Sequence, residues 1–216
     1  MTKRDVGGMG ESVLRKWAHE RGAVINKAEY DRGGWDFLIE WEPVRRENRV
    51  PLDRQEGSLQ CLVQVKATDS NARRRSVSLR NWHRFSTTAL PAFYLVLEFS
   101  GKADCQAAFL RHHWERDIEE TLKRLRTLDA AGIEDFSRKT RNLTWGSSDA
   151  IAPTSEALFG ALERVIATSL ADYSQKKAKL VSVRPKTQSR ASCCRVRGPS
   201  FGRRSPHCPS RVRMSA

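Results

Sequence analysis

Residues 60–67 read QCLVQVKA, and this stretch decides the fold that we expect for the chain. Apolar and polar residues alternate along it, with the period of a β-strand whose two faces meet different surroundings. One face carries Cys61, Val63, Val65 and Ala67, and the other carries Gln60, Leu62, Gln64 and Lys66. The alternation therefore predicts a strand on which an amide, Gln64, and an ammonium group, Lys66, lie two residues apart on one face.

A second strand is expected shortly before this one in the chain. Residues 35–41 read WDFLIEW after a Gly-Gly pair, and their alternation places Asp36 on the face away from both tryptophans. Residues 43–58 between the two strands are polar and contain two prolines and a glycine, which is typical of a hairpin loop. Strands joined by a hairpin lie side by side, so we expect Asp36 close to Gln64 and Lys66.

The chain up to residue 173 completes an α/β pattern. The run FYLVLEF at 93–99 is almost entirely apolar, as expected of a central strand buried on both faces. Helices are predicted at 11–21, 78–88, 114–128 and 155–173, further strands at 23–25 and 105–110, and irregular segments at 69–76 and 129–153. This order favours an α/β fold with a mixed sheet of four to five strands and helices on both faces.

The positive charge of the chain is concentrated at its C-terminal end. The net charge is +14, yet residues 176–216 contain twelve Lys and Arg and no Asp or Glu, which leaves 27 basic and 25 acidic residues before them. This end also lacks apolar periodicity, so it would bury too little surface to offset the entropy of ordering. We expect three parts: a core at 1–112, a helical extension packed on it at 113–174, and a basic disordered tail at 175–216.

Composition excludes several classes of protein. No apolar run reaches the roughly 18 residues of a membrane-spanning helix, and the first residues do not resemble a signal peptide, so we expect a cytoplasmic protein without a membrane partner. Five cysteines are an odd number and do not form a disulfide framework. Neither a Gly-rich phosphate loop nor a zinc-finger spacing is present.

The polar residues on the two predicted strands suggest a metal site. A carboxylate, an amide and an ammonium group at the surface of a sheet are costly to bury unless something compensates them. A hard divalent cation would do so, because Mg²⁺ binds a few protein oxygens and completes its shell with water and phosphate oxygens. Lys66 would then orient or deprotonate an attacking water and stabilise the charge developing on a phosphate.

The order of these motifs resembles the PD-(D/E)XK nuclease superfamily. It runs GMGESVLRKWAHERG at 8–22, DRGGWDFLIE at 31–40 and LVQVKAT at 62–68. The chain is most similar to Mrr-type restriction endonuclease-like domains and related bacterial defence domains of unknown function, in which Gln often replaces the acidic residue two positions before the lysine. The resemblance covers roughly residues 7–99 and implies a restriction-endonuclease-like three-layer core.

The resemblance also implies roles for individual residues. Asp36 and Gln64 would be the metal ligands, Lys66 the catalytic lysine, and Glu11 a support for the metal or the water. The cofactor would be Mg²⁺, with Mn²⁺ able to substitute. The implied activity is hydrolysis of phosphodiester bonds in DNA, in restriction or phage defence, and cutting both strands of a duplex would need two sites, as in a homodimer. Three consecutive arginines would hold phosphates beside the site: Arg73, Arg74 and Arg75.

Each of these assignments has a simpler alternative. Gln64 and Lys66 would be solvated if the sheet were covered on one side only, and Asp36 would be an ordinary residue at the start of a strand. Glu11 lies at the edge of an apolar helix stripe, which also suits a helix surface. The three arginines would be solvated in a polar loop. Residues 112–113, a His-His pair, have no cysteine partner at zinc spacing, and we expect no metal there.

Two other functions stay open from the sequence. An amide holds a cation less strongly than a carboxylate does, so Gln64 is compatible with a catalytically inactive nuclease-like domain that binds nucleic acid or a protein partner. The basic tail alone would also bind nucleic acid without sequence preference.

Overall fold

The structure is a computed structural model that describes residues 4–28, 34–42, 57–166 and 169–182. Contacts divide the chain into two parts, residues 1–184 and 185–216, and every described residue belongs to the first part. The segment 43–56, which covers most of the expected hairpin loop, and the residues after 182 lie outside the described residues.

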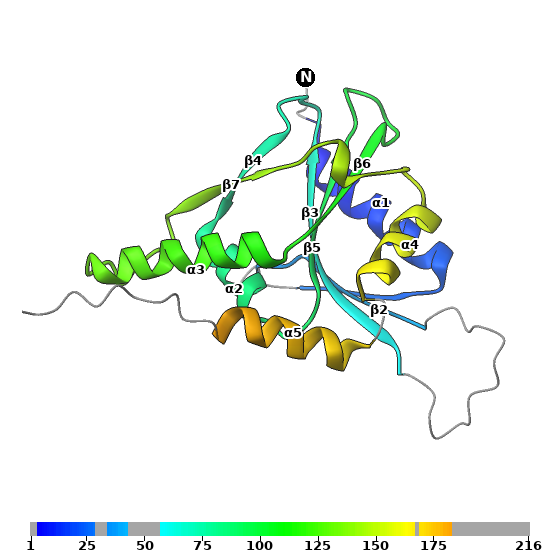
Figure 1. Ribbon diagram of the computed structural model, residues 1–216. Helices are drawn as coiled ribbons and strands as arrows, with labels where there is room; N and C mark the ends of the chain where they lie inside the picture. The colour runs from blue at the N-terminus through cyan, green and yellow to red at the C-terminus, as the bar shows by residue number, and fades with distance from the viewer. Residues whose placement is uncertain (1–3, 29–33, 43–56, 167–168, 183–216) are drawn as a thin grey trace, which may run out of the picture. The chain divides into compact units, whose positions relative to one another are not determined.

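A mixed sheet forms the centre of the fold, and it confirms the expected α/β class (Figure 1). Its six strands, one more than expected, lie in the order β1-β2-β3-β5-β6-β8. The strands are β1 (Val24–Lys27), β2 (Phe37–Trp41), β3 (Leu59–Thr68), β5 (Ala92–Glu98), β6 (Ala107–His112) and β8 (Ala150–Ile151). Strands β3 and β5 are parallel, and the other neighbours are antiparallel.

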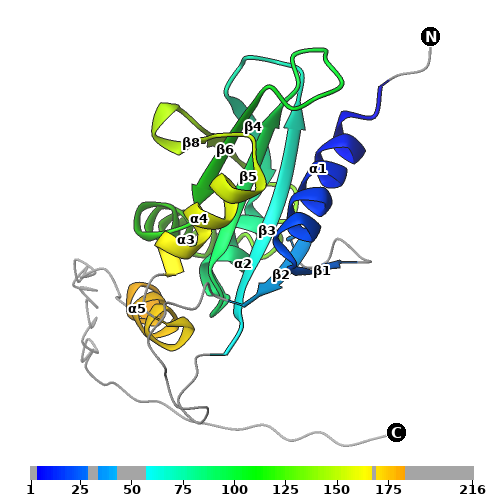
Figure 2. The ribbon, with the colours of Figure 1, turned by 90° about the vertical axis from the view of Figure 1, so that its right-hand side faces the viewer.

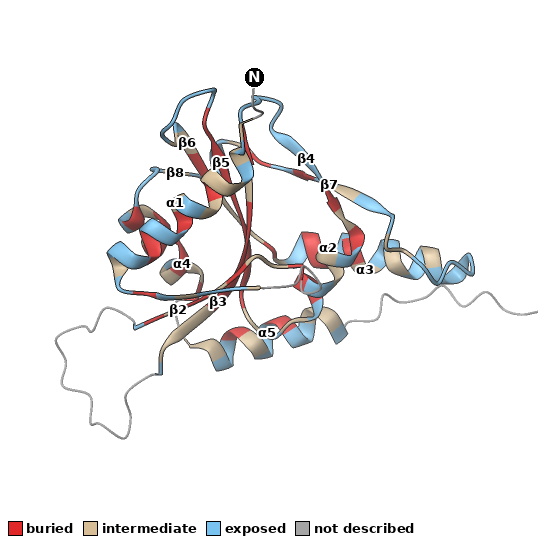
Figure 3. Cartoon of the chain, turned by 180° about the vertical axis from the view of Figure 1, so that it is seen from behind, coloured by how far each residue is buried: buried red, intermediate tan, exposed pale blue. Residues whose placement is uncertain are grey.

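Helices cover both faces of this sheet (Figure 2). They are α1 (Val6–Arg21), α2 (Leu79–Thr87), α3 (Glu115–Ala130), α4 (Ser155–Ile166) and α5 (Leu170–Ser182). Helices α1 and α4 contribute to one core cluster, which includes the Val63, Val65 and Ala67 face of β3. Helices α2 and α3 contribute to the second cluster, on the Leu62 face. Strand β5 is buried throughout because it is covered on both sides (Figure 3).

Helix α1 begins earlier than residue 11, where the apolar stripe becomes regular. The Asp5 carboxylate accepts a hydrogen bond from the Gly8 N–H, which caps the first turn. One turn later Gly10 lies against β3, where an added Cβ would come within 2.7 Å of the Ala67 Cβ. Glycine therefore lets the helix approach the strand closely, and this contact fixes which face of β3 the helix covers.

Several element boundaries expected from the sequence are wrong. The polar segment 69–76 contains most of strand β4 (Arg74–Ser78), which pairs with β7 (Thr140–Thr144) inside the segment expected to be irregular. These strands are short and largely exposed, so the alternation of apolar and polar residues along them is weak. Val77 and Leu143 stabilise them by packing in the second core cluster. The single helix expected at 155–173 is two helices, and the second continues to Ser182, beyond the expected start of the tail at residue 175.

Helix α5 stays ordered in a basic segment because it docks on the end of the sheet. The Tyr173 hydroxyl hydrogen-bonds to His112 Nε2 at 2.7 Å, and the Lys177 ammonium group donates to the Leu90 carbonyl at 2.9 Å. Lys177 is 1% exposed. None of the helices in the described part of the chain is long and apolar enough to cross a bilayer.

Candidate active site

Asp36 lies just before β2 and contacts the centre of β3. Its backbone N–H donates to the Val63 carbonyl at 3.0 Å, and its carboxylate Oδ2 accepts from the Val65 N–H at 2.7 Å. Val65 is the residue between Gln64 and Lys66. The structure therefore brings the carboxylate of Asp36 to the QVK segment, as the hairpin arrangement predicted.

Gln64 is the most unusual polar residue of the sheet. It is 2% exposed, and its Oε1 atom has no hydrogen-bond partner within the described part of the chain. Its paired residue on the neighbouring strand β5 is Tyr94. The buried hydroxyl of Tyr94 also has no hydrogen-bond partner among the described residues. An unpaired buried acceptor costs about 1–3 kcal/mol. Such a cost is commonly associated with an unseen ligand, water or ion, so Gln64 is a stronger candidate in the structure than in the sequence.

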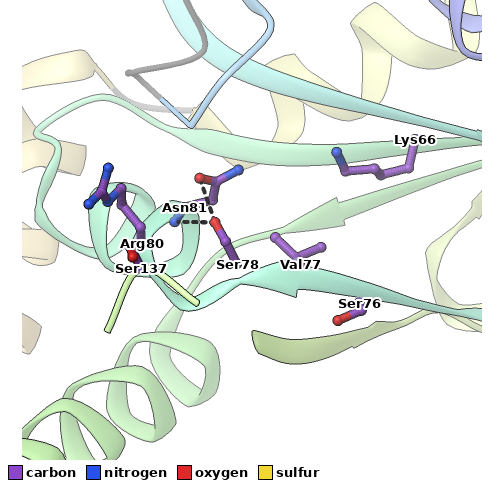
Figure 4. A pocket seen from close by; sticks show the side chains of 7 residues that line it. All are labelled: Lys66, Ser76, Val77, Ser78, Arg80, Asn81 and Ser137. Carbon is purple, nitrogen blue, oxygen red and sulfur yellow. Dashed lines mark hydrogen bonds between the residues drawn. The ribbon is translucent and has the colours of Figure 1, made fainter. Parts of the chain in front are cut away.

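Lys66 lies on the face of β3 opposite the Val65 and Ala67 face that α1 covers, and its side chain lines a pocket (Figure 4). The residue is partly buried and pairs with Val96 of β5. The pocket has a volume of about 310 Å³. Its lining residues come from β3, β4, the start of α2 and the segment before β7: Lys66, Ser76, Val77, Ser78, Arg80, Asn81 and Ser137. Of these, only Lys66 was predicted from the sequence to be a site residue, because the others are scattered over polar segments.

Glu11 is not brought to the same side of β3 as Gln64 and Lys66. Helix α1 covers the opposite face, which carries Val65 and Ala67. The Glu11 carboxylate forms an ion pair with Lys27 of β1 at 2.6 Å. Lys27 pairs with Phe37, the residue after Asp36, so Glu11 is near the start of β2 but is neutralised by a lysine.

The three arginines follow β3 but do not form one solvated loop. Arg73 has a positive φ of 45° and stacks its guanidinium over the Phe109 ring, 4.9 Å from the centroid. Arg74 and Arg75 belong to β4, and Arg75 donates to the Ala67 carbonyl at 3.2 Å. All three residues are exposed. They therefore present positive charge beside the Lys66 end of β3.

The His-His pair has a structural role. His112 bonds to Tyr173, and Nε2 of the fully buried His113 lies 3.0 Å from the Ser86 hydroxyl. Burial lowers the pKa of His112 to about 3 and holds the pKa of His113 well below its ordinary value, so both rings are neutral. His112 is the last residue of β6, and His113 lies between β6 and α3.

The donors near β3 fit a cation that needs few protein ligands. Asp36 offers a carboxylate, and Gln64 offers a buried amide oxygen that lacks a donor. The fit is limited to these two side chains, since the described residues contain no group of three or more His, Cys, Asp or Glu that could hold a metal. Mg²⁺ accepts this kind of incomplete protein shell, because water and phosphate oxygens complete it.

Comparisons of the chain with known protein families, with curated proteins and with solved structures gave no match. The PD-(D/E)XK assignment therefore stays a prediction that depends on the order of the motifs and on the geometry around β3.

Proposed function

We propose that this chain is a metal-dependent nuclease of the PD-(D/E)XK type that hydrolyses phosphodiester bonds in DNA. A cytoplasmic role in restriction or phage defence, and action on duplex DNA as a homodimer, belong to the same proposal. The observation that supports it most is the hydrogen bond from the Val65 N–H to Asp36, because it joins a carboxylate to the strand that carries Gln64 and Lys66.

In this proposal Asp36, Gln64 and Lys66 have different roles. Asp36 and Gln64 would hold Mg²⁺, or Mn²⁺ in its place, and the bound ion would supply a Lewis acid for the phosphate and an acidic water. Lys66 would position that water or take its proton, and its charge would oppose the negative charge that builds up on the phosphate oxygens. Glu11, paired with Lys27, would act on these residues only through the start of β2.

A second candidate function is binding of nucleic acid or a protein partner without cleavage. It is favoured by one specific observation: the second ligand position holds an amide whose oxygen is screened from solvent.

A cleavage assay on plasmid and on single-stranded DNA separates the two functions. The parent should cut with Mg²⁺ or Mn²⁺ and stop in EDTA. Lys66→Ala should lower the rate by about 100-fold or more and leave DNA affinity nearly unchanged, because one cation is a small part of the footprint. The matched control is Lys16→Ala, which removes an exposed lysine from α1. DNA binding without cutting in either metal would favour the second candidate.

A further inference from the structure

The pocket beside Lys66 has the chemical character of an anion site. Its lining contains two cationic side chains, Lys66 and Arg80, and no carboxylate. The carboxylate of Asp135 interacts electrostatically with Arg80, but Asp135 does not line the pocket. This carboxylate accepts a hydrogen bond from the Ser137 N–H. Ser137 is therefore occupied, and the groups that a ligand would meet come from β3, β4 and α2.

The orientation of Asn81 adds a donor to these cations. The Ser78 hydroxyl donates to Asn81 Oδ1 at 2.8 Å and accepts from the Asn81 N–H at 3.3 Å. Because Oδ1 is used by Ser78, the amide NH₂ group of Asn81 is turned toward Lys66 (Figure 4). The pocket thus combines the ammonium group of Lys66 with an oriented amide donor, and Arg80 lines it beyond Asn81 (Figure 4). All three groups suit phosphate oxygens.

We propose that this pocket binds a phosphate group of the nucleic acid strand, next to the phosphate that is cut. The inference rests on the proposed function, since Lys66 lines the pocket and also belongs to the candidate active site. Asn81 donates to the neighbouring phosphate, Arg80 adds positive charge at the far end of the pocket, and Lys66 lies between the neighbouring phosphate and the phosphate that is cut. A volume of about 310 Å³ is at the small end of ligand pockets and accommodates a phosphate with its sugar.

The first test compares two arginines of one helix. Arg80→Gln removes a pocket cation, and Arg84→Gln removes the same charge one turn later, outside this pocket. The probe is the 5′-phosphorylated trinucleotide pTpTpT, titrated calorimetrically against the full chain in EDTA. Arg80→Gln should weaken binding roughly tenfold, and Arg84→Gln by less than about twofold. Equal losses in the two variants would overturn the proposal, because they would indicate only a general attraction.

The second test keeps the fold and reverses the local charge. Asn81→Asp retains the oxygen that accepts from Ser78, and an acidic residue in the first turn of a helix is favourable. The melting temperature should therefore stay constant or rise, while affinity for pTpTpT falls at least tenfold. Unchanged affinity, or a loss of affinity that accompanies a lower melting temperature, would count against the pocket.

Failure of this inference is distinguishable from failure of the nuclease proposal, because binding is measured without metal. If the parent does not cut DNA, but Arg80→Gln and Asn81→Asp each weaken pTpTpT binding, the phosphate pocket is supported and the hydrolysis is rejected. If the parent cuts DNA, and both pocket variants bind pTpTpT and cut DNA as the parent does, the hydrolysis is supported and the pocket is rejected.

Discussion

The carboxylate of Asp36 lies 2.7 Å from the backbone nitrogen of Val65, in the middle of the QVK segment. Strand β2 begins only at Phe37, so this side chain satisfies a β3 backbone donor beyond the end of the regular ladder. Asp36 therefore has a structural role that is independent of any metal, and experiments on it must separate the two.

Two substitutions of Asp36 separate structure from chemistry. Asp36→Asn keeps an oxygen for the Val65 N–H, so its free energy of unfolding should stay within about 1 kcal/mol of the parent. Cleavage should nevertheless be lost, because an amide is a weaker ligand for magnesium. Asp36→Ala should lose cleavage and also about 1–3 kcal/mol of stability. Urea unfolding and plasmid cleavage measure the two effects. An Asp36→Asn variant that cuts at the parent's rate would remove Asp36 from the metal site.

Gln64 offers a test of the second ligand. Gln64→Glu places a carboxylate in a buried position, so its melting temperature in EDTA should fall. Magnesium should restore that temperature, and cleavage should survive at lower magnesium concentrations than the parent needs. Gln64→Ala should reduce cleavage more than Gln64→Glu does. The control is Gln106→Glu, an exposed glutamine, whose melting temperature should not respond to magnesium beyond the parent's response. Parental activity in Gln64→Ala would contradict the assignment.

The burial of Lys177 leads us to expect that the stability of the chain depends on pH. Burial lowers the pKa of its ammonium group from 10.5 to about 7 in the folded chain. Between these values the unfolded chain binds more protons, so the free energy of unfolding should rise with pH above about 7. Lys177→Met should abolish this rise and be more stable than the parent at pH 6.5, where the parent buries a charge. Urea unfolding from pH 6.5 to 8.5 measures both. Lys179→Met, in an exposed position on α5, should keep the parental slope.

The extent of α5 can be tested by truncation. A chain ending at Ser182 keeps the whole helix and should melt within about 2 °C of the parent. A chain ending at Ser174 loses the buried Lys177 and should melt lower. Residues 183–216 contain nine Lys and Arg, so removing them should flatten the salt dependence of DNA binding. Equal melting temperatures for the two truncated chains would mean that α5 adds nothing after residue 174.

Several elements could be predicted because their signals are local. The alternation in β3, the apolar run of β5 and the Ser78 cap of α2 each depend on residues within one turn or one strand. Strands β4 and β7 could not be found in this way, since their order comes from pairing between residues far apart in the chain, such as Arg75 and Leu143. Lys177 was equally hidden, because lysine is rarely buried and only a carbonyl from another element makes its burial tolerable.

The sequence by itself determined the α/β class and the placing of Gln64 and Lys66 on one face of a strand, because side-chain direction in a strand follows from the period of two. Only the tertiary structure decided that Asp36 bonds to Val65, that Glu11 lies on the opposite side of β3, and that Arg80 and Asn81 join Lys66 around a pocket. These relationships join segments distant in sequence, and they depend on strand register and on how closely helices approach the sheet. Neither quantity is encoded in any short stretch of residues.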